Sequence, residues 1–559
     1  MLGAFIALIV TFVPLGANAL WPIPRSLQTG TTLLKLASSF DIKISVTNPP
    51  QDLVDAVSRT KGFIQNDKLQ RLVVGRGAND SAALGSAPTL PGLTISLLNN
   101  NAPRAIATEA VQAIGTRSEG YSLTVPTDGT SAILTANSTL GLFRGLTTFE
   151  QLWYDSAGVT YSYQAPVKIV NDIPAFPYRG FMLDTARNFF PVADIKRTLD
   201  AMSWVKINTF HWHIVDSQSF PLDVPGFPEI ASKGAYSSTE IYSPANIQDI
   251  VSYAAARGVD VMMEIDTPGH TAIIANSHPE HIACNQASPW TDFANEPPAG
   301  QLRLASAATT NFTASLISAI AQALPSKLFS TGGDELNTNC YAKDSQTQAD
   351  LKSSGKTLEQ ALSTFTQATH KSLTDLGKTP VVWEEMVLEH TVTLPKDTVV
   401  MVWISSQHAA SVASKNFRIV HAPSNYFYLD CGAGEWLGND PTGNSWCDPF
   451  KTWQKSYTFD PFAGLSTAQR SLVLGGQQLL WAEQSSPENI DSIVWPRAAS
   501  SAEIFWTGAT LPDGTARNVG SALPRLHDIR YRMVRRGVRA IALQPHWCAL
   551  RPGVCDLRA

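Results

Sequence analysis

The sequence predicts an α/β protein in which a (β/α)8 barrel is preceded by a smaller α+β domain. From Ile173 onward, short apolar segments alternate with amphipathic ones, which is the pattern of repeated strand–helix units and a parallel sheet. We count eight predicted strands in this part of the chain, the number that closes a (β/α)8 barrel. Such a pattern can also form an open, doubly wound sheet, so the count of eight is what favours the barrel.

The composition is that of an ordinary globular protein with room for two or three domains. The chain has 559 residues, of which 44% are hydrophobic and 16% are charged. Its formal net charge is -5, so it lacks the basic footprint that nucleic-acid-binding proteins usually carry.

The first residues have the features of a secretory signal peptide, which we place at residues 1–19. Leu2 to Leu15 is largely apolar, and Ala17-Asn18-Ala19 matches an A-x-A cleavage signature. Pro14 interrupts the apolar stretch, which is also shorter than the ~20 residues that a membrane-spanning helix needs. We therefore expect a secreted protein without a membrane anchor.

The mature chain is expected to divide near residue 172. Residues 20–172 would form a non-catalytic α+β domain, because they hold no evident cluster of acids, histidines or thiols. Residues 173–559 would form the barrel. Predicted strands in the first domain are Asp41–Val46, Thr94–Leu98 and Tyr121–Val125, and predicted helices are Thr108–Ile114 and Leu140–Leu152.

The barrel strands and helices follow from the same alternation. The predicted strands are Gly180–Asp184, Thr209–Asp216, Asp260–Ile265, Lys327–Thr331, Pro380–Trp383, Val399–Ile404, Arg418–Ala422 and Gln478–Trp481. Amphipathic helices are predicted at Val192–Lys206, Ala245–Arg257, Thr313–Leu324 and Leu358–Leu376. In such a barrel, chemistry takes place at the carboxyl ends of the strands.

A secreted location makes the six cysteines candidates for disulfides. Six cysteines allow fifteen pairings, and the sequence leaves the choice open. The nearest-neighbour set joins Cys284 to Cys340, Cys431 to Cys447 and Cys548 to Cys555. Three N-x-S/T sequons suit the same compartment and predict glycosylation at Asn79, Asn137 and Asn311.

Two adjacent acids, Asp334 and Glu335, follow the fourth predicted strand after a pair of glycines. Neighbouring residues of a regular strand point to opposite faces, so both acids can serve one pocket only if Gly332 and Gly333 break that alternation. Taken alone, Gly-Gly-Asp-Glu is more often a surface turn, since four residues are a weak motif.

Polar and aromatic residues gather at the other predicted strand ends as well. The second strand carries His211 and His213 and ends at Asp216, and the third leads to Asp266 and His270. The first strand is preceded by Arg179 and leads to Asp184-Thr-Ala-Arg187. The other ends carry Trp383 (fifth), Trp403 (sixth), Tyr428 and Asp430 (seventh), and Trp481 and Glu483 (eighth).

This set has the composition of a carbohydrate site. Tryptophan faces match the apolar C–H faces of sugar rings and exclude water. Arg179, Asp430 and Glu483 could form charge-assisted, directional hydrogen bonds with sugar hydroxyls. Glycoside cleavage then needs a carboxylic acid that protonates the leaving oxygen.

Seven motifs carry a resemblance to a known family. They are Arg179-Gly-Phe-Met-Leu-Asp-Thr-Ala-Arg, His211-Trp-His-Ile-Val-Asp, Thr267-Pro-Gly-His, Gly332-Gly-Asp-Glu, Val382-Trp-Glu-Glu, Tyr428-Leu-Asp and Leu480-Trp-Ala-Glu. In this order they resemble the β-N-acetylhexosaminidases of glycoside hydrolase family 20 over nearly the whole chain. The cysteine positions and the chain's ending are similar to those of secreted fungal members.

The resemblance implies a role for each site residue. Glu335 would be the general acid/base, and Asp334 would orient the substrate's 2-acetamido group and stabilise its positive charge. Tyr428 would donate to the acetamido oxygen, while Asp216 and His270 would form a relay that tunes Glu335. Sugar hydroxyls would be bound by Arg179, Asp430 and Glu483, and the acetamido pocket and sugar platform would be formed by Trp383, Trp403 and Trp481.

The resemblance also implies exo-acting, substrate-assisted hydrolysis of terminal β-linked GlcNAc or GalNAc. The acetamido oxygen would attack C1 to give an oxazolinium intermediate, so no carboxylate nucleophile is needed, and configuration is retained. Two positions depart from the family: many members have His where Ser330 stands, and a second acid often stands at Ser217. We expect altered tuning and a changed pH optimum there rather than lost activity.

Two other functions are compatible with parts of the pattern. His211-x-His213, joined by His270, could be the ligand set of a metal-dependent barrel hydrolase, although strand parity puts Asp216 on the other face. A non-catalytic carbohydrate-binding relative could keep the tryptophans and lose the chemistry. A metal-dependent hydrolase would be recognised by its need for a metal ion. A non-catalytic relative would be recognised by its failure to hydrolyse a chromogenic N-acetylglucosaminide.

Several features stay open at this stage. The resemblance implies no cofactor and no metal, and a carbohydrate substrate such as chitobiose, chitin oligomers or N-glycans. The preference between GlcNAc and GalNAc, which differ only at C4, does not follow from the residues. The similarity to fungal members suggests a homodimer.

Overall fold

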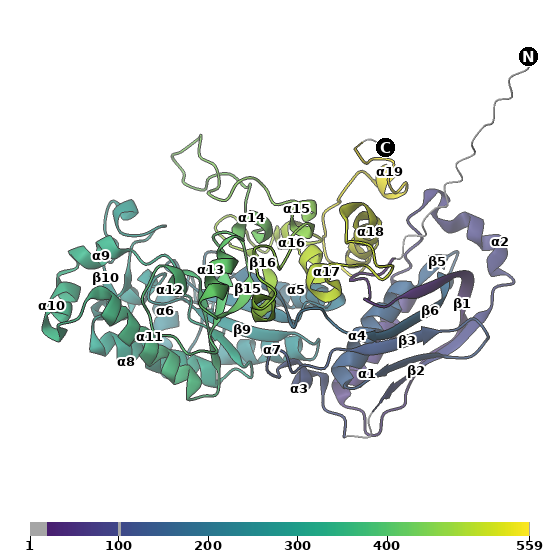
Figure 1. The fold of residues 1–559 in the computed structure, drawn as a ribbon, viewed down its shortest axis with the longest axis horizontal. Coiled ribbons are helices and arrows are strands. Elements are labelled where there is room, and N and C mark those ends of the chain that lie inside the picture. The colour runs from purple at the N-terminus through teal and green to yellow at the C-terminus, as the bar shows by residue number, and fades with distance from the viewer. Residues whose placement is uncertain (1–18, 99–101, 558–559) are drawn as a thin grey trace, which may run out of the picture.

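A barrel and a smaller sheet domain lie side by side in the molecule (Figure 1). The computed structural model describes residues 19–98 and 102–557. Of the predicted signal peptide only Ala19 is described, so residues 1–18 of that prediction lie outside the described part. Within the described ranges, no helix combines the length and the apolar character needed to cross a bilayer.

The N-terminal domain is built on a six-stranded mixed sheet with the order β1-β2-β4-β3-β6-β5 and an additional pairing of β1 with β6. The strands are β1 (Gln28–Ile44), β2 (Thr89–Leu97), β3 (Tyr121–Val125), β4 (Ala132–Ala136), β5 (Tyr154–Ser156) and β6 (Val159–Asp172). β3 has its predicted bounds. β1 starts well before the predicted strand. The prediction missed its first residues, Gln28 to Thr32, because they are mostly polar and show no alternation of apolar and polar side chains. β4, β5 and β6 were not predicted.

Helices cover the face of this sheet that is turned toward the barrel. They include α1 (Gln51–Asn66), α3 (Ile106–Ala110) and α4 (Thr139–Phe149), whereas α2 (Ser81–Leu84) lies at the end of the domain away from the barrel (Figure 1). Every residue of α4 is buried, because the helix lies between the sheet and the barrel (Figure 1). Ser138 caps it by accepting a hydrogen bond from the Gly141 amide at 3.0 Å.

The second domain is a closed barrel of eight parallel strands in the order β12-β13-β14-β15-β16-β7-β8-β9, which confirms the predicted (β/α)8 architecture. The strands are β7 (Tyr178–Asp184), β8 (Thr209–Val215), β9 (Asp260–Ile265), β12 (Leu328–Ser330), β13 (Thr379–Trp383), β14 (Val399–Val402), β15 (Arg418–His421) and β16 (Val473–Leu480). β16 begins earlier than predicted, at a stretch containing Gly475. A Cβ at Gly475 would lie 1.8 Å from the Tyr178 carbonyl oxygen, so glycine is needed where β16 meets β7.

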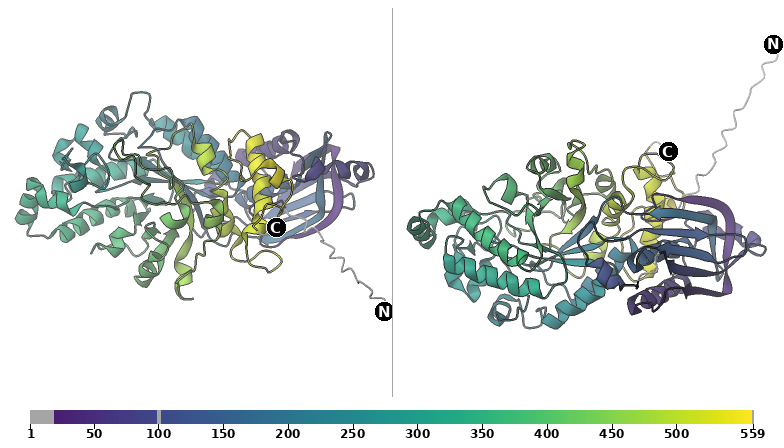
Figure 2. Two further views of the ribbon diagram at one scale, coloured as in Figure 1. Left: turned by 90° about the horizontal axis from the view of Figure 1, so that it is seen from above. Right: turned by 60° about the horizontal axis from the view of Figure 1, so that its bottom comes forward.

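Helices surround the barrel strands (Figure 2). The four predicted helices are present as α5 (Val192–Trp204), α7 (Pro244–Ala255), α8 (Ala307–Gln322) and α11 (Leu358–Thr374). The others include α6 (Pro228–Gly234), α9 (Thr338–Lys343), α10 (Ser345–Ser354), α12 (Glu385–Leu388), α13 (His408–Ser414), α14 (Ser424–Phe427), α15 (Trp453–Tyr457), α16 (Ile490–Val494), α17 (Ala499–Thr507), α18 (Val519–Arg535) and α19 (His546–Ala549).

Arg179 lies at the amino end of β7, in the contact between the two domains. Its side chain is fully buried and donates hydrogen bonds to Glu119 at 2.5 Å and to the carbonyls of Lys206 at 2.8 Å and Phe176 at 2.9 Å. Glu119 also accepts from Arg144 at 2.9 Å. The expectation that Arg179 binds sugar hydroxyls is therefore wrong: its donors are used at the domain contact, at the opposite end of the strand from the carboxyl-end mouth.

The three disulfides are the nearest-neighbour set: Cys284–Cys340, Cys431–Cys447 and Cys548–Cys555. The first two brace loops on the carboxyl-end side of the barrel. The sequon residues Asn79, Asn137 and Asn311 are all exposed, as glycan acceptors must be, and their glycosylation stays a prediction.

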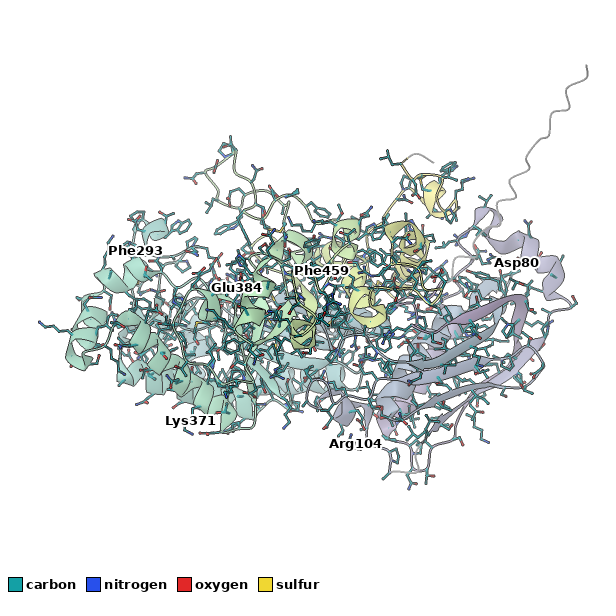
Figure 3. The ribbon with its side chains drawn as sticks, viewed as in Figure 1. Asp80, Arg104, Phe293, Lys371, Glu384 and Phe459 are labelled. Atoms are coloured by element: carbon teal, nitrogen blue, oxygen red, sulfur yellow. A yellow bond between two sulfur atoms is a disulfide. The ribbon has the colours of Figure 1, made fainter. Side chains whose placement is uncertain are left out.

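We expect Arg179→Gln to lower the melting temperature by several degrees and to leave KM for an aryl N-acetylglucosaminide unchanged in the folded protein. The reason is that Glu119 would stay buried with one cation fewer, which costs on the order of 3 kcal/mol. Thermal unfolding and steady-state kinetics measure the two quantities. Lys371→Gln is the control, because Lys371 is exposed at the surface (Figure 3) and its pair with Asp375 contributes little. A raised KM at unchanged melting temperature would restore Arg179 as a ligand.

Candidate active site

Asp334 and Glu335 enter one cavity because the backbone after β12 leaves the extended conformation. Gly332, Gly333 and Glu335 have φ angles of 64°, 98° and 54°. A Cβ at Gly332 would lie 1.9 Å from Asp266 Oδ1, and the Gly333 amide donates to the same oxygen at 2.8 Å. The predicted break in strand alternation is confirmed, and both acids line a cavity of about 490 Å³.

Aromatic rings form one wall of this cavity. Trp403 and Tyr428 are stacked with ring centroids 6.2 Å apart, and Trp481 lies 6.3 Å from Tyr428. Trp446, which is 64% exposed, meets Trp403 and Tyr428 edge-on from the loop closed by the Cys431–Cys447 disulfide. The wall is therefore partly rigid barrel and partly a clamped loop.

Trp383 does not lie on the cavity surface. Its side chain is 1% exposed and packs behind Trp481, with ring centroids 6.2 Å apart. The residues that line the cavity include Trp403, Trp481 and Trp446 instead. Trp383, the last residue of β13, therefore backs the aromatic wall rather than lining the cavity, and its expected place in the acetamido pocket stays a prediction.

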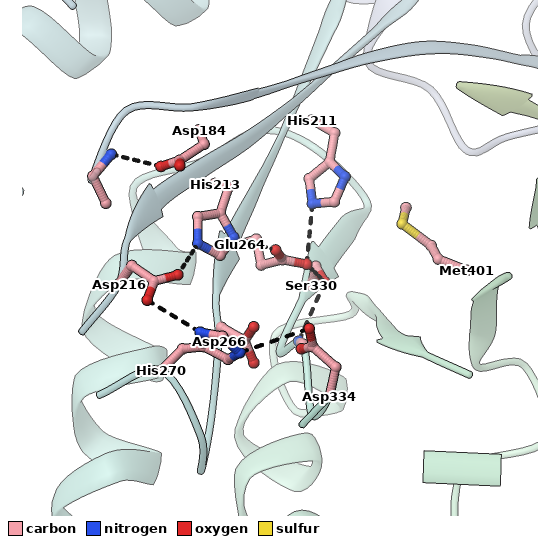
Figure 4. Close-up of polar contacts among 12 residues, drawn as sticks. Asp184, His211, His213, Asp216, Glu264, Asp266, His270, Ser330, Asp334 and Met401 are labelled. Atoms are coloured by element: carbon pink, nitrogen blue, oxygen red, sulfur yellow. Dashed lines mark hydrogen bonds and ion pairs between the residues drawn. The ribbon is translucent and has the colours of Figure 1, made fainter. Parts of the chain in front are cut away.

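Glu335 is joined to a buried chain of charges, part of which Figure 4 shows. His270 Nε2 lies 3.4 Å from Glu335 Oε2, and His270 Nδ1 lies 3.1 Å from Asp216 Oδ1. Burial disfavours the imidazolium, but Asp216 and Glu335 outweigh it and hold the pKa of His270 well above its ordinary value. Burial raises the pKa of Glu335, but His270 outweighs this and leaves it below the ordinary value.

The chain of charges continues into the barrel through residues that sequence reasoning did not assign. His213 lies between Asp216 Oδ2 and Glu264 Oε1, at 2.6 Å from each, and these contacts outweigh burial and raise its pKa to about 9. Ser330 donates to Glu264 Oε2 at 2.5 Å. The signal in the sequence was Glu264 itself, a single acid inside an apolar strand.

Asp334 lies near two other buried acids, Asp266 and Glu385. Burial raises the pKa of Asp334, and burial together with the Asp334 charge raises that of Asp266 well above its usual range. Glu385, whose pKa is raised to about 9 by burial and by Asp334, accepts from Trp403 Nε1 at 2.9 Å. Asp334 Oδ1 is buried and has no hydrogen-bond partner among the described residues.

Arg187, rather than Arg179, brings a guanidinium into the cavity. It pairs with Asp216 at 2.8 Å and with Glu296, and lies 5.1 Å above the Trp481 ring. Asp184 positions it by accepting from the Arg187 amide at 3.2 Å. The motif Arg179-Gly-Phe-Met-Leu-Asp-Thr-Ala-Arg was in view in the sequence, and the choice between its two arginines was the error.

Asp430 and Glu483 line the cavity as expected. Burial, followed by the Glu483 charge, raises the pKa of Asp430 to about 8. Burial also raises the pKa of Glu483, against the opposing effect of Arg187. The raised pKa values favour a protonated carboxyl group in this pair. A protonated carboxyl group can donate a hydrogen bond to a hydroxyl, and an ionised one can accept a hydrogen bond from it.

Comparison with known proteins agrees with this geometry. Residues 176–509 match the catalytic domain of glycosyl hydrolase family 20, and residues 20–152 match a beta-acetyl hexosaminidase-like domain. The chain belongs to glycoside hydrolase family 20.

Relatives of this family 20 chain share its length and fold. A β-hexosaminidase of Arthroderma benhamiae is 34% identical over 91% of this chain and 86% of its own. A chitooligosaccharidolytic β-N-acetylglucosaminidase of Bombyx mori is 33% identical over 96% and 89%. Among solved structures, a chitobiase of Flavobacterium johnsoniae has a TM-score of 0.73 and 25% identity, covering 93% of this chain and 73% of that one.

In this family 20 site, the histidines fit a metal-ligand set poorly. Ligation needs neutral imidazoles with a free nitrogen. Both nitrogens of His213 face carboxylates at 2.6 Å, and the pKa of His213 and that of His270 are raised rather than lowered, against burial, by those acids. The arrangement favours a proton relay over a metal centre.

We expect His270→Gln to move the alkaline limb of the kcat/KM profile to higher pH and to lower kcat by about 10- to 100-fold. The acid form of Glu335 is the one that can protonate a leaving group, and loss of the neighbouring imidazolium raises the pKa of Glu335. Rates on an aryl N-acetylglucosaminide from pH 3 to 9 (roughly the titration range of these groups) measure the shift. His390→Gln, in a pair with Glu359 that takes no part in the cavity, is the control. An unshifted or lowered alkaline limb would contradict the relay.

Proposed function

We propose that this family 20 chain hydrolyses terminal non-reducing β-linked GlcNAc or GalNAc with retention, through an oxazolinium intermediate formed by the substrate's own acetamido group. The observation that carries the proposal is the pairing of two acids with different surroundings in one cavity. Glu335 faces the His270–Asp216 relay, while Asp334 offers a buried, unpartnered oxygen beside an aromatic wall.

In the first step, Glu335 gives its proton to the glycosidic oxygen as the bond from that oxygen to C1 breaks. The acetamido oxygen forms a new bond to C1, and the resulting positive charge spreads over the oxazolinium ring. Asp334 accepts from the acetamido N–H through Oδ1 and stabilises that charge. Tyr428, whose ring lines the cavity, donates to the acetamido oxygen.

In the second step, a water attacks C1 and gives a proton to Glu335, which now acts as a base. The bond from C1 to the acetamido oxygen breaks, and the acetamido group is restored. Two inversions at C1 leave the configuration retained.

The hydroxyl groups of the sugar would be bound by Arg187, Asp430 and Glu483, which replaces Arg179 in the expected set. These three residues line the same cavity as the two acids. Charge-assisted hydrogen bonds of this kind are directional, so they fix the ring against Trp481 and Trp403.

The expected substrates are chitobiose, chitin oligomers or N-glycans. The names of the insect relatives, which describe chitooligosaccharide-cleaving enzymes, support the first two. Three disulfides and three exposed sequons support secretion. The homodimer stays a prediction that no observation here tests.

The two alternatives find less support. A metal-dependent hydrolase would need His211 and His213 as neutral ligands, whereas the contacts of His213 with Asp216 and Glu264 raise its pKa to about 9, which favours the protonated ring. A purely carbohydrate-binding relative would have no use for a charged chain leading from Glu264 to Glu335. Activity that survives exhaustive chelation removes the first, and turnover of a chromogenic N-acetylglucosaminide removes the second.

We expect Glu335→Gln to lower kcat on aryl β-GlcNAc substrates by roughly 10²- to 10⁴-fold with little change in sugar binding, because the amide cannot give a proton. Steady-state kinetics and GlcNAc inhibition constants measure the two effects. Glu240→Gln is the control, as Glu240 bonds only with Ser237 near the surface. An unchanged kcat would remove the acid assignment.

We expect aryl β-glucosides to be hydrolysed about 10³-fold more slowly than aryl β-GlcNAc, because they lack the group that attacks C1. A thiazoline mimic of the intermediate should bind about 10²-fold more tightly than GlcNAc or better, and Asp334→Asn should abolish most of that gain. Rates on a panel of aryl β-GlcNAc, β-GalNAc and β-Glc substrates measure the first effect. Comparable turnover of the glucoside would overturn acetamido participation.

A further inference from the structure

Two histidines and a glutamate meet on a surface loop after β9, outside the active-site cavity. The short helix η4 (Pro279–His281) brings His278, Glu280 and His281 together, with one ligand atom of each within 4.8 Å of the others. His278 Nδ1 lies 3.3 Å, and His281 Nε2 3.8 Å, from the same oxygen, Glu280 Oε1. None of the three residues lines the catalytic cavity.

The other nitrogen of each ring is held by a neighbouring side chain. His278 Nε2 lies 3.0 Å from Glu229 Oε1, and His281 Nδ1 lies 3.0 Å from Thr309 Oγ1. When His278 donates its Nε2 proton to Glu229, its Nδ1 lone pair faces the Glu280 carboxylate. Two facing acceptors repel each other unless a proton or a metal ion lies between them. Partners on the outer nitrogen are also what fixes metal-binding histidines.

Packing holds the two rings in place and leaves the carboxylate exposed to solvent. Phe312 of α8 lies 4.8 Å from the His278 ring and 4.4 Å from the His281 ring. The side chains of His278 and His281 are 21% and 10% exposed, whereas that of Glu280 is 61% exposed. A cation can therefore enter from solvent, and the carboxylate can close on it.

We propose that His278 Nδ1, Glu280 and His281 Nε2 bind one Zn²⁺ ion or a similar borderline divalent cation, with water completing the shell. Two imidazoles and a carboxylate suit this class of metal. In a tetrahedral site with bonds of about 2.0–2.1 Å, ligand atoms lie about 3.3 Å apart. The separations of 3.3 and 3.8 Å from Glu280 Oε1 to the two ring nitrogens are near this value, and all three ligand atoms lie within 4.8 Å of one another, so the set is within reach of one ion.

The surrounding charges are compatible with this site. Burial lowers the pKa of His281, which favours the neutral imidazole that ligation needs. A backbone hydrogen bond, followed in effect by His278, lowers the pKa of Glu280 and keeps it ionised. Arg303, a cation packed against the loop, donates instead to the Glu280 carbonyl at 2.8 Å and pairs with Asp344 at 3.1 Å.

The ion would act as a structural clamp on this loop. The loop runs from His270 of the relay to Cys284 of the Cys284–Cys340 disulfide, and the site lies between these two fixed points. Binding would tie η4 to α6 through Glu229 and to α8 through Thr309. The established chemistry needs no metal at this place, so the site is separate from turnover.

The test uses untagged, full-length protein stripped with a chelator and then titrated with Zn²⁺ near pH 7.5. We expect one equivalent to bind, a higher melting temperature with Zn²⁺, and visible d–d absorption when Co²⁺ is used instead. His278→Gln and His281→Gln should each weaken binding by about 10-fold or more. His408→Gln, another partly exposed imidazole paired with a carboxylate, is the matched control and should leave the Zn²⁺ affinity unchanged.

Two results would overturn the proposal. One is the absence of saturable Zn²⁺ binding to the wild-type protein, in which case a protonated His278 accounts for the contacts with Glu229 and Glu280. The other is binding that persists unchanged in both variants, which would place the ion elsewhere. Circular dichroism of the variants separates a lost ligand from a lost fold, and a folded variant with unaltered affinity counts against the site.

Discussion

The contact between the Gly332–Gly333 turn and Asp266 is the constraint on which the site depends. The Gly333 amide donates to Asp266 Oδ1, and no Cβ can stand at Gly332, so the chain is bent where β12 ends. This bend sends two consecutive carboxyl groups into one cavity, which a regular strand cannot do. A substrate that supplies its own nucleophile needs such a pair and no third acid beside C1.

The same bend places each acid in a different electrostatic setting. Glu335 meets the imidazolium of His270, and positive and negative groups then alternate through Asp216 and His213 to Glu264. Beyond it, Glu264 Oε2 accepts from the neutral Ser330 hydroxyl at 2.5 Å and lies 3.1 Å from His211 Nε2. The Ser330 hydroxyl, unlike an imidazole, cannot change its charge at this place, which is a physical basis for the altered tuning expected from the sequence.

The sequence was sufficient where the pattern is local and insufficient where it depends on contacts between distant segments. Eight strands and the paired acids follow from periodicity and motif, whereas the sequence left the disulfide pairing open and the structure has the nearest-neighbour set. The depth of Trp383 and the early start of β16 depend on which ring packs behind another and on a backbone approach of Gly475 to Tyr178. The order of residues along the chain does not predict either of these two contacts.

The two arginines of one motif show why position along a strand decides function in this fold. Arg179 lies at the amino end of β7 and Arg187 follows its carboxyl end. Ligands of this fold bind at the carboxyl ends of the strands (the open end), whereas the amino end is covered here by the other domain (the closed end). At the closed end, Arg179 meets Glu119 of the other domain and has no access to a ligand. At the open end, Arg187 meets Asp216 beside the cavity. The same guanidinium therefore stabilises the domain contact at one end of a strand and can bind a ligand at the other.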